Sequence, residues 1–150
     1  MPELSVTAER LVGAPAEHTY WCIADYRTHH PRFLPPAFSD FQVEQGGVGA
    51  GTVHRFQLNA GGRTRTYRMR VEEPQPGHVL TESDTGSSLV TTWTVTPEGQ
   101  RCRVRLDTRW QGAGGVGGVF ERLFAPRVLR RIYEDELERL DRYARTTQSD

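Results

Sequence analysis

The chain has 150 residues, of which 36% are hydrophobic, and its 19 basic residues balance 19 acidic residues. A chain of this length is expected to fold as one domain, residues 1–150. The balanced charge argues against a partner that is recognised by bulk charge, such as a nucleic acid or an anionic membrane. All the basic residues are arginines, so chemistry that needs a lysine Schiff base or a lysine general base is excluded.

The two cysteines and the N-terminal residues indicate where the protein resides. Cys22 and Cys102 are too far apart in sequence for a CxxC motif, and both have apolar neighbours, which is typical of buried thiols in a reducing compartment. The N-terminal residues lack the basic region and apolar run of a signal peptide. No apolar stretch approaches the roughly 18 residues of a membrane span. We therefore expect a soluble, cytoplasmic protein.

The first quarter of the chain is expected to contain one strand and two helical pieces. Residues 4–12 favour a strand, which ends at Gly13. Pro15 suits the first turn of a helix that runs to about Ala24. Residues 25–36 are rich in histidine, proline and aromatic side chains, and we expect a loop or a short helix there.

The middle of the chain reads as a series of strands with short turns between them. The turns are rich in glycine and proline. Connections this short favour an antiparallel meander over crossovers through helices. With residues 4–12, the predicted strands number seven; the other six span residues 38–44, 52–59, 64–71, 79–84, 89–96 and 101–110.

The last strand and the segment after it carry the clearest pattern in the chain. Residues 101–110 alternate between apolar or neutral side chains and charged ones, which is typical of a half-buried strand. Five glycines between positions 112 and 118 follow it, and a helical period then runs from about Val119 to Ala144. We expect Pro126 to divide this helix in two. The first piece could then act as a lid that is hinged on the glycines.

Several short motifs occur in order along these elements: Ala14-Pro15-Ala16, Asp25-Tyr26, the segment 30–35, Gly49-Ala50-Gly51 and Leu137-Glu138-Arg139-Leu140. Together with the order of the elements, they resemble a known family, the START-like or Bet v 1-like (SRPBCC) superfamily, which includes bacterial proteins of the polyketide cyclase/dehydrase type. The resemblance covers nearly the whole chain. It implies an α+β helix-grip fold, in which a curved seven-stranded antiparallel sheet wraps around a long C-terminal helix and leaves a cavity for apolar ligands.

Strand alternation sorts the side chains that would face such a cavity. In 52–59 and 64–71 the arginines on one face direct the apolar face inward, whereas in 79–84 the choice of face stays open. A filled core is the alternative to a cavity. The candidate ligand-binding residues are His54, Phe56, Tyr67, Met69, Thr91, Trp93, Leu106, Thr108, Phe120, Phe124, Tyr133 and Glu136.

Three of these candidates can move protons: His54, Tyr67 and Glu136. Burial would raise the pKa of Glu136, and histidine titrates near neutral pH. A His54–Glu136 pair across the cavity is therefore one acid/base hypothesis, and an interior histidine with a structural role is its alternative. His29 and His30 lack a third ligand at usable spacing, so we expect no metal, and no motif indicates a cofactor.

Two functions remain. The first is binding of a small hydrophobic or aromatic molecule, such as a lipid, an isoprenoid or a polyketide-like compound, in an internal cavity. The second, which the resemblance suggests, is a cyclase or dehydratase of the polyketide type. The sequence leaves the formation of a homodimer open.

Overall fold

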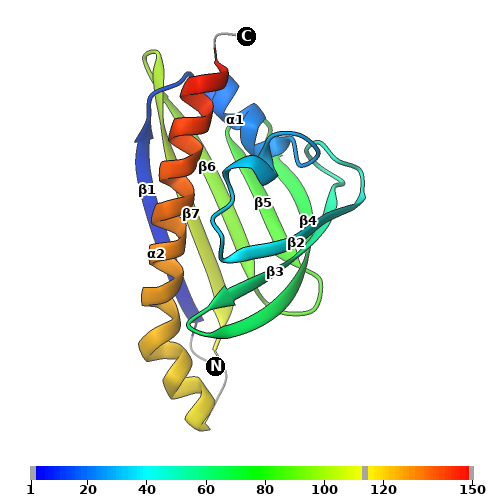
Figure 1. Cartoon of the computed structure of the whole chain (residues 1–150), viewed down its shortest axis with the longest axis vertical. Helices are drawn as coiled ribbons and strands as arrows, with labels where there is room; N and C mark the ends of the chain where they lie inside the picture. The colour runs from blue at the N-terminus through cyan, green and yellow to red at the C-terminus, as the bar shows by residue number, and fades with distance from the viewer. Residues whose placement is uncertain (1–2, 113–114, 149–150) are drawn as a thin grey trace.

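The computed structural model of the chain describes residues 3–112 and 115–148, and the side chains of residues 115–125 lie outside the described part. One sheet, two α-helices and a short 3-10 helix make up this part (Figure 1). In chain order they are β1 (Glu3–Val12), α1 (Ala16–Ala24), η1 (His30–Phe33), β2 (Phe38–Gln45), β3 (Val53–Ala60), β4 (Arg63–Gln75), β5 (Val79–Asp84), β6 (Val90–Glu98), β7 (Arg101–Gln111) and α2 (Gly115–Thr147).

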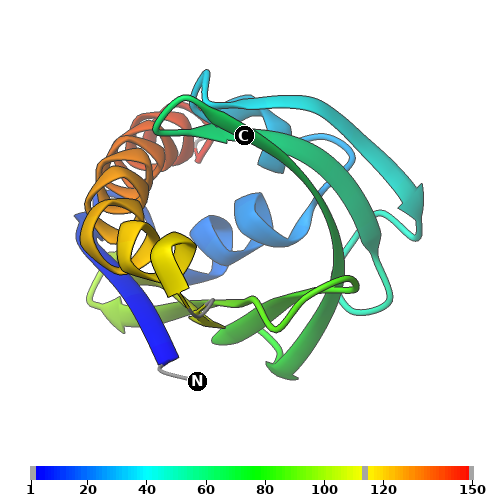
Figure 2. The ribbon, with the colours of Figure 1, turned by 90° about the horizontal axis from the view of Figure 1, so that it is seen from below.

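The seven strands form one antiparallel sheet in the order β1-β7-β6-β5-β4-β3-β2. Figure 2 shows that the sheet is strongly curved, with α2 along its open side and α1 across one end. From β2 to β7, each strand pairs with the next strand in sequence through a short connection, which makes an antiparallel meander. The strand β1 pairs with β7 at the edge of the sheet. The predicted seven-stranded sheet with a long C-terminal helix is confirmed.

The helix α2 packs on the sheet through an apolar stripe. Leu137, Leu140 and Ala144 are fully or almost fully buried, at the spacing of one helix face. They belong to the same core as Val6 on β1 and Val104 on β7. Burying a leucine side chain fully contributes roughly 1.5–3 kcal/mol, so this stripe fixes α2 against one end of the sheet.

The prediction that Pro126 divides the terminal helix is wrong. The helix α2 is 33 residues long and is not interrupted at Pro126. Gly115, Gly117 and Gly118 lie inside this helix rather than in a hinge before it. A proline removes one backbone hydrogen bond, but packing of the residues that follow it on the sheet holds the helix together. The predicted lid depends on Phe120 and Phe124, whose side chains lie outside the described residues.

Candidate ligand cavity

A cavity of about 500 Å³ lies between the concave face of the sheet and α2. Ligand pockets of roughly 300–1,000 Å³ are usual for small molecules. Exposed residues at the β3–β4 turn and in the segment between β5 and β6, among them Gly61, Arg65 and Ser87, form its mouth. Buried residues form its inner end, and these include His54, Glu82 and Glu136. The sheet and α2 therefore enclose a space that is open at one end.

Strand alternation, together with the helical period of α2, directs most of the predicted side chains into this space. Nine of the twelve predicted binding residues line the cavity: His54, Phe56, Tyr67, Met69, Thr91, Trp93, Leu106, Tyr133 and Glu136. Thr108 is fully buried behind the wall, and the side chains of Phe120 and Phe124 lie outside the described residues. Their contact with a ligand stays a prediction.

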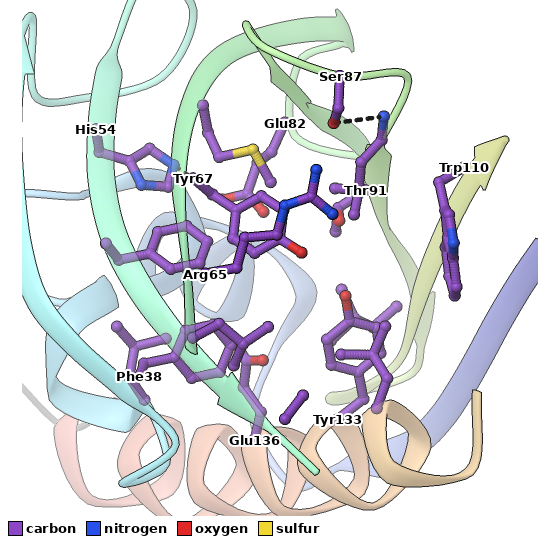
Figure 3. A pocket seen from close by; sticks show the side chains of 18 of the residues that line it. Phe38, His54, Arg65, Tyr67, Glu82, Ser87, Thr91, Trp110, Tyr133 and Glu136 are labelled. Carbon is purple, nitrogen blue, oxygen red and sulfur yellow. Dashed lines mark hydrogen bonds and ion pairs between the residues drawn. The ribbon is translucent and has the colours of Figure 1, made fainter. Parts of the chain in front are cut away.

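Three hydroxyl groups form a polar strip that connects the sheet to α2. The Oγ1 atoms of Thr91 and Thr108 are 2.7 Å apart, and the hydroxyl of Tyr133 lies 2.5 Å from Thr108 Oγ1. Burial is the main cause of the raised pKa of Tyr133, so its phenol keeps its proton. Figure 3 shows Thr91 on the sheet and Tyr133 on α2, with the Tyr133 hydroxyl directed towards the sheet.

Glu82 on β5 is a buried charged residue of the cavity that the sequence did not identify as a binding residue. Its Oε2 accepts a hydrogen bond of 2.5 Å from the Tyr26 hydroxyl, and its Oε1 accepts one of 3.2 Å from Trp93 Nε1. Its Oε2 also lies 3.2 Å from His54 Nε2. Burial alone would raise the pKa of Glu82, but the contact and charge of His54, together with His30 and Tyr26, outweigh it and lower the pKa.

His54 is stacked among aromatic rings at the inner end. Its ring centroid lies 4.4 Å from that of Tyr26, 5.3 Å from Phe41 and 5.7 Å from Phe56. Its side chain is almost wholly buried. The contact with Glu82 is an ion pair by distance but does not meet hydrogen-bond angles, and neither ring nitrogen has a hydrogen-bond partner among the described residues. A buried polar atom without a partner is unusual, and it indicates a place where a ligand could bond.

Glu136 faces the same cavity from α2. It is buried, and none of the hydrogen bonds found in the described part of the chain reaches its carboxyl group. Burial first, and then the charge of Glu82, raise its pKa well above the ordinary value, as predicted, which favours the protonated form. The charged partner of His54 is Glu82 rather than Glu136, although all three side chains line one cavity.

The other histidines and Tyr67 have different surroundings. His30 Nδ1 donates to the Ile23 carbonyl at 2.7 Å, and burial lowers the pKa of His30 to about 4. His29 Nδ1 lies 2.5 Å from the Tyr143 hydroxyl. Tyr67 lines the cavity with the Arg65 guanidinium 5.5 Å from its ring centroid. Across residues 3–112 and 115–148, no group of three or more metal-ligating side chains was found.

Comparison with known proteins identifies the family of this fold. The model of a family described as polyketide cyclase / dehydrase and lipid transport matches residues 3–145. The chain belongs to this family. The resemblance found in the sequence is thereby confirmed. No curated protein matches the chain in sequence. Within the described residues, no helix of this family member is long and apolar enough to cross a membrane.

Solved structures agree with the family assignment. The solution structure of the KanY protein (ms6282) is 40% identical, with a TM-score of 0.85 over 97% of this chain and 99% of that one. The Zhui aromatase/cyclase from Streptomyces sp. R1128 is 18% identical, with a TM-score of 0.76 over 96% and 94% of the two chains. Norcoclaurine synthase from Thalictrum flavum is 17% identical, with a TM-score of 0.74 over 99% and 90%. The last two share the Bet v 1-like fold and show nothing further.

Proposed function

We propose that this family member binds a small hydrophobic or aromatic molecule, such as a lipid, an isoprenoid or a polyketide-like compound, between its sheet and α2. The observation that carries the proposal is the cavity of about 500 Å³, which is enclosed by the elements that define the fold. Its wall is mainly apolar and aromatic, and a few polar groups lie at its inner end. This combination is typical of sites that take up an apolar body and orient it by a few hydrogen bonds.

The aromatic rings of the wall form a nearly continuous surface across β2, β3 and β4. The ring centroids of Phe38 and Phe56 are 5.3 Å apart, and those of Phe56 and Tyr67 are 5.7 Å apart. Aromatic side chains bury a large area and favour offset or edge contacts with other rings. The wall therefore supports binding of a ligand that is itself flat or unsaturated.

Filling the cavity is expected to weaken ligand binding strongly. Ala60 lines the cavity near its mouth, whereas its neighbour Asn59 points outward and is exposed. An Ala60→Trp substitution places an indole in the ligand's space, and an overpacking penalty of about 1–3 kcal/mol corresponds to roughly five- to 150-fold weaker binding. The check is native mass spectrometry of protein purified from its own host, followed by denaturing extraction of any bound molecule.

The matched control is Asn59→Trp, which adds the same bulk on the other face of β3. The proposal requires a stoichiometric apolar molecule in the wild type and in Asn59→Trp, and its loss from Ala60→Trp. An empty wild-type protein, or equal occupancy in both variants, would contradict binding in this cavity.

A second candidate function, a cyclase or dehydratase that acts on a polyketide-like substrate, is favoured by a separate observation. The cavity holds two carboxyl groups whose pKa values are shifted in opposite directions, lowered for Glu82 and raised for Glu136. Such pairs are typical of acid/base sites. His54, beside Glu82, would accept a proton, and Glu136 would donate one, with Tyr67 as a further proton donor.

Catalysis predicts that a linear precursor and its cyclised product are extracted together from the wild-type protein. Loss of a general acid or base usually costs about 10²–10⁴-fold in rate. The conversion rate of the extracted precursor should therefore fall by that factor in Glu136→Gln and in His54→Ala. Unchanged conversion by both variants would remove the enzyme hypothesis and leave binding.

A further inference from the structure

The inner end of the cavity contains buried charged and polar side chains that uptake of a purely apolar molecule does not require. A cavity for hydrocarbon alone needs no buried carboxylate, because burying a charge costs free energy unless the charge is paired. Here Glu82 is buried and held by three neighbours: Tyr26, Trp93 and His54. His54 in turn has no hydrogen-bond partner among the described residues for either ring nitrogen.

We propose that this inner end is a subsite for an uncharged hydroxyl group of the ligand, in which His54 makes the contact and Glu82 is the positioning residue that fixes its ring. The inference rests on the proposed binding function and narrows the class of ligand. The ligand would be a flat ring compound that enters with its oxygen-bearing end first.

The contacts of Glu82 explain its role as a positioning residue. Its Oε2 lies 3.2 Å from His54 Nε2, while bonds from Tyr26 and Trp93 hold the carboxylate itself in place. A carboxylate beside one nitrogen of an imidazole fixes which nitrogen carries the proton and how the ring is turned. The other nitrogen, Nδ1, is buried and has no hydrogen-bond partner among the described residues, so its lone pair would be satisfied by a hydroxyl group bound at this end of the cavity.

The stacking around His54 limits the shape of that group. Tyr26 lies 4.4 Å from the ring centroid of His54, at an interplanar angle of 25°. Phe41 and Phe56 lie near it at 30° and 20°. The imidazole is therefore held nearly parallel to its neighbours, and an approach to Nδ1 lies close to the plane of the ring. A planar ligand with an oxygen at its edge satisfies this geometry.

The charges at the inner end favour a neutral ligand group. A ligand carboxylate would lie near the ionised Glu82, in surroundings where Glu136 already remains protonated. Both oxygens of Glu82 already accept hydrogen bonds, from Tyr26 and Trp93, and His54 lies 3.2 Å from Oε2, so Glu82 offers little to a ligand ammonium group, whose own burial costs free energy. A hydroxyl group can accept a hydrogen bond from the Glu136 acid or donate one to His54 Nδ1 without adding a charge. Figure 3 shows His54, Glu82 and Glu136 around this part of the cavity.

Four probes with one carbon skeleton test the inference: naphthalene, 2-naphthol, 2-naphthoate and 2-naphthylmethylammonium. Their affinities are measured by displacement of the neutral dye N-phenyl-1-naphthylamine from the full chain. A hydrogen bond contributes about 0.5–1.5 kcal/mol, so 2-naphthol should bind roughly three- to tenfold more tightly than naphthalene. Both charged probes should bind more weakly than 2-naphthol.

Two variants test separately the contact of His54 with the ligand and the positioning of His54 by Glu82. In His54→Phe, which keeps a ring but removes both nitrogens, the advantage of 2-naphthol over naphthalene should disappear. In Glu82→Gln the advantage should fall several-fold while the affinity for naphthalene is unchanged. Glu72→Gln on the exposed face of β4 is the matched control and should keep the full advantage. A merely structural Glu82 would instead weaken all four probes equally.

Nitrogen-15 spectra of the histidine rings provide a measurement that does not depend on the variants folding. In the wild-type protein, 2-naphthol should shift a ring nitrogen resonance of His54, whereas the resonance of His78, whose Nδ1 bonds to the Val95 carbonyl, should stay fixed. Naphthalene should leave the nitrogen shifts of His54 nearly unchanged.

The outcomes distinguish the two levels of inference. If neither the dye nor naphthalene binds, the proposed binding function is wrong and this inference falls with it. If they bind but 2-naphthol has no advantage, or if a charged probe binds most tightly, the binding function stands and the oxygen subsite is wrong. An advantage that survives His54→Phe would also overturn the assignment to His54.

Discussion

Replacing Glu136 with glutamine is expected to raise the free energy of unfolding at pH 7 by up to about 3 kcal/mol. The carboxyl group is buried and lacks hydrogen bonds from the described residues, and burial raises its pKa well above the ordinary value of 4.5. The folded chain must therefore either keep Glu136 protonated or bury its charge at neutral pH, and both cost stability. Glutamine has the same shape and no charge to lose.

The increase in the free energy of unfolding that Glu136→Gln produces should depend on pH. Because folding raises the pKa of Glu136, its contribution to stability is fully present below the unfolded pKa and is lost as the pH rises. The variant and the wild type should be equally stable near pH 4, and the variant should be increasingly more stable towards pH 7. Urea unfolding at several pH values measures this difference.

The control for this experiment is Glu138→Gln on the same helix, where the side chain is exposed. Surface substitutions usually change stability by less than about 0.5 kcal/mol, and little dependence on pH is expected. A Glu136→Gln variant that gained nothing, or gained equally at every pH, would contradict the burial of a neutral carboxyl group. A higher free energy of unfolding for Glu136→Gln would show that the native Glu136 destabilises the folded chain, which is typical of groups at functional sites.

Much of the fold could be predicted because the relevant signals are local. The alternation of residues 101–110 and 52–59 depends only on neighbours in sequence, and both segments are strands whose inward faces were correctly assigned. The short turns then restricted the topology to an antiparallel meander. Seven of the nine predicted residues that line the cavity follow from the same alternation, and Tyr133 and Glu136 follow from the helical period of α2.

Glu82 could not be placed because its strand is short and ambiguous. In residues 79–84 the apolar side chains Val79 and Leu80 lie on opposite faces, so alternation alone chooses neither. Pairing with neighbouring strands decides: Glu82 lies opposite Val71 on β4 and Thr91 on β6, and both of these face inward. A prediction that used the registers of all three strands together would have found it.

The remaining differences arise from contacts between residues that are distant in sequence. A His54–Glu136 pair was one hypothesis from the sequence, and strand pairing and the curvature of the sheet place Glu82, which that hypothesis did not include, 3.2 Å from His54. Pro126 was expected to end a helix by a local rule, and packing of α2 on the sheet overrides that rule. Local patterns thus predicted which residues surround the cavity but not which of them interact.

Replacing Glu82 with leucine is expected to lower the free energy of unfolding by about 3–5 kcal/mol at pH 7. The substitution leaves the Tyr26 hydroxyl and Trp93 Nε1 buried without their acceptor, and it removes the ion pair with His54. Each buried group left without a partner costs about 1–3 kcal/mol. Urea unfolding of the variant, compared with the exposed Glu72→Leu on the adjacent strand, measures the loss.

At acid pH, the difference in the free energy of unfolding between the wild type and Glu82→Leu should become smaller. Folding lowers the pKa of Glu82, so its contribution to stability is present above the ordinary value of 4.5 and is lost as the pH falls below it. Glu136 has the opposite dependence, because its contribution is lost as the pH rises. Two glutamates in one cavity would then produce opposite pH profiles of stability, and profiles of the same sign would contradict the assignment of one as carboxylate and the other as neutral acid.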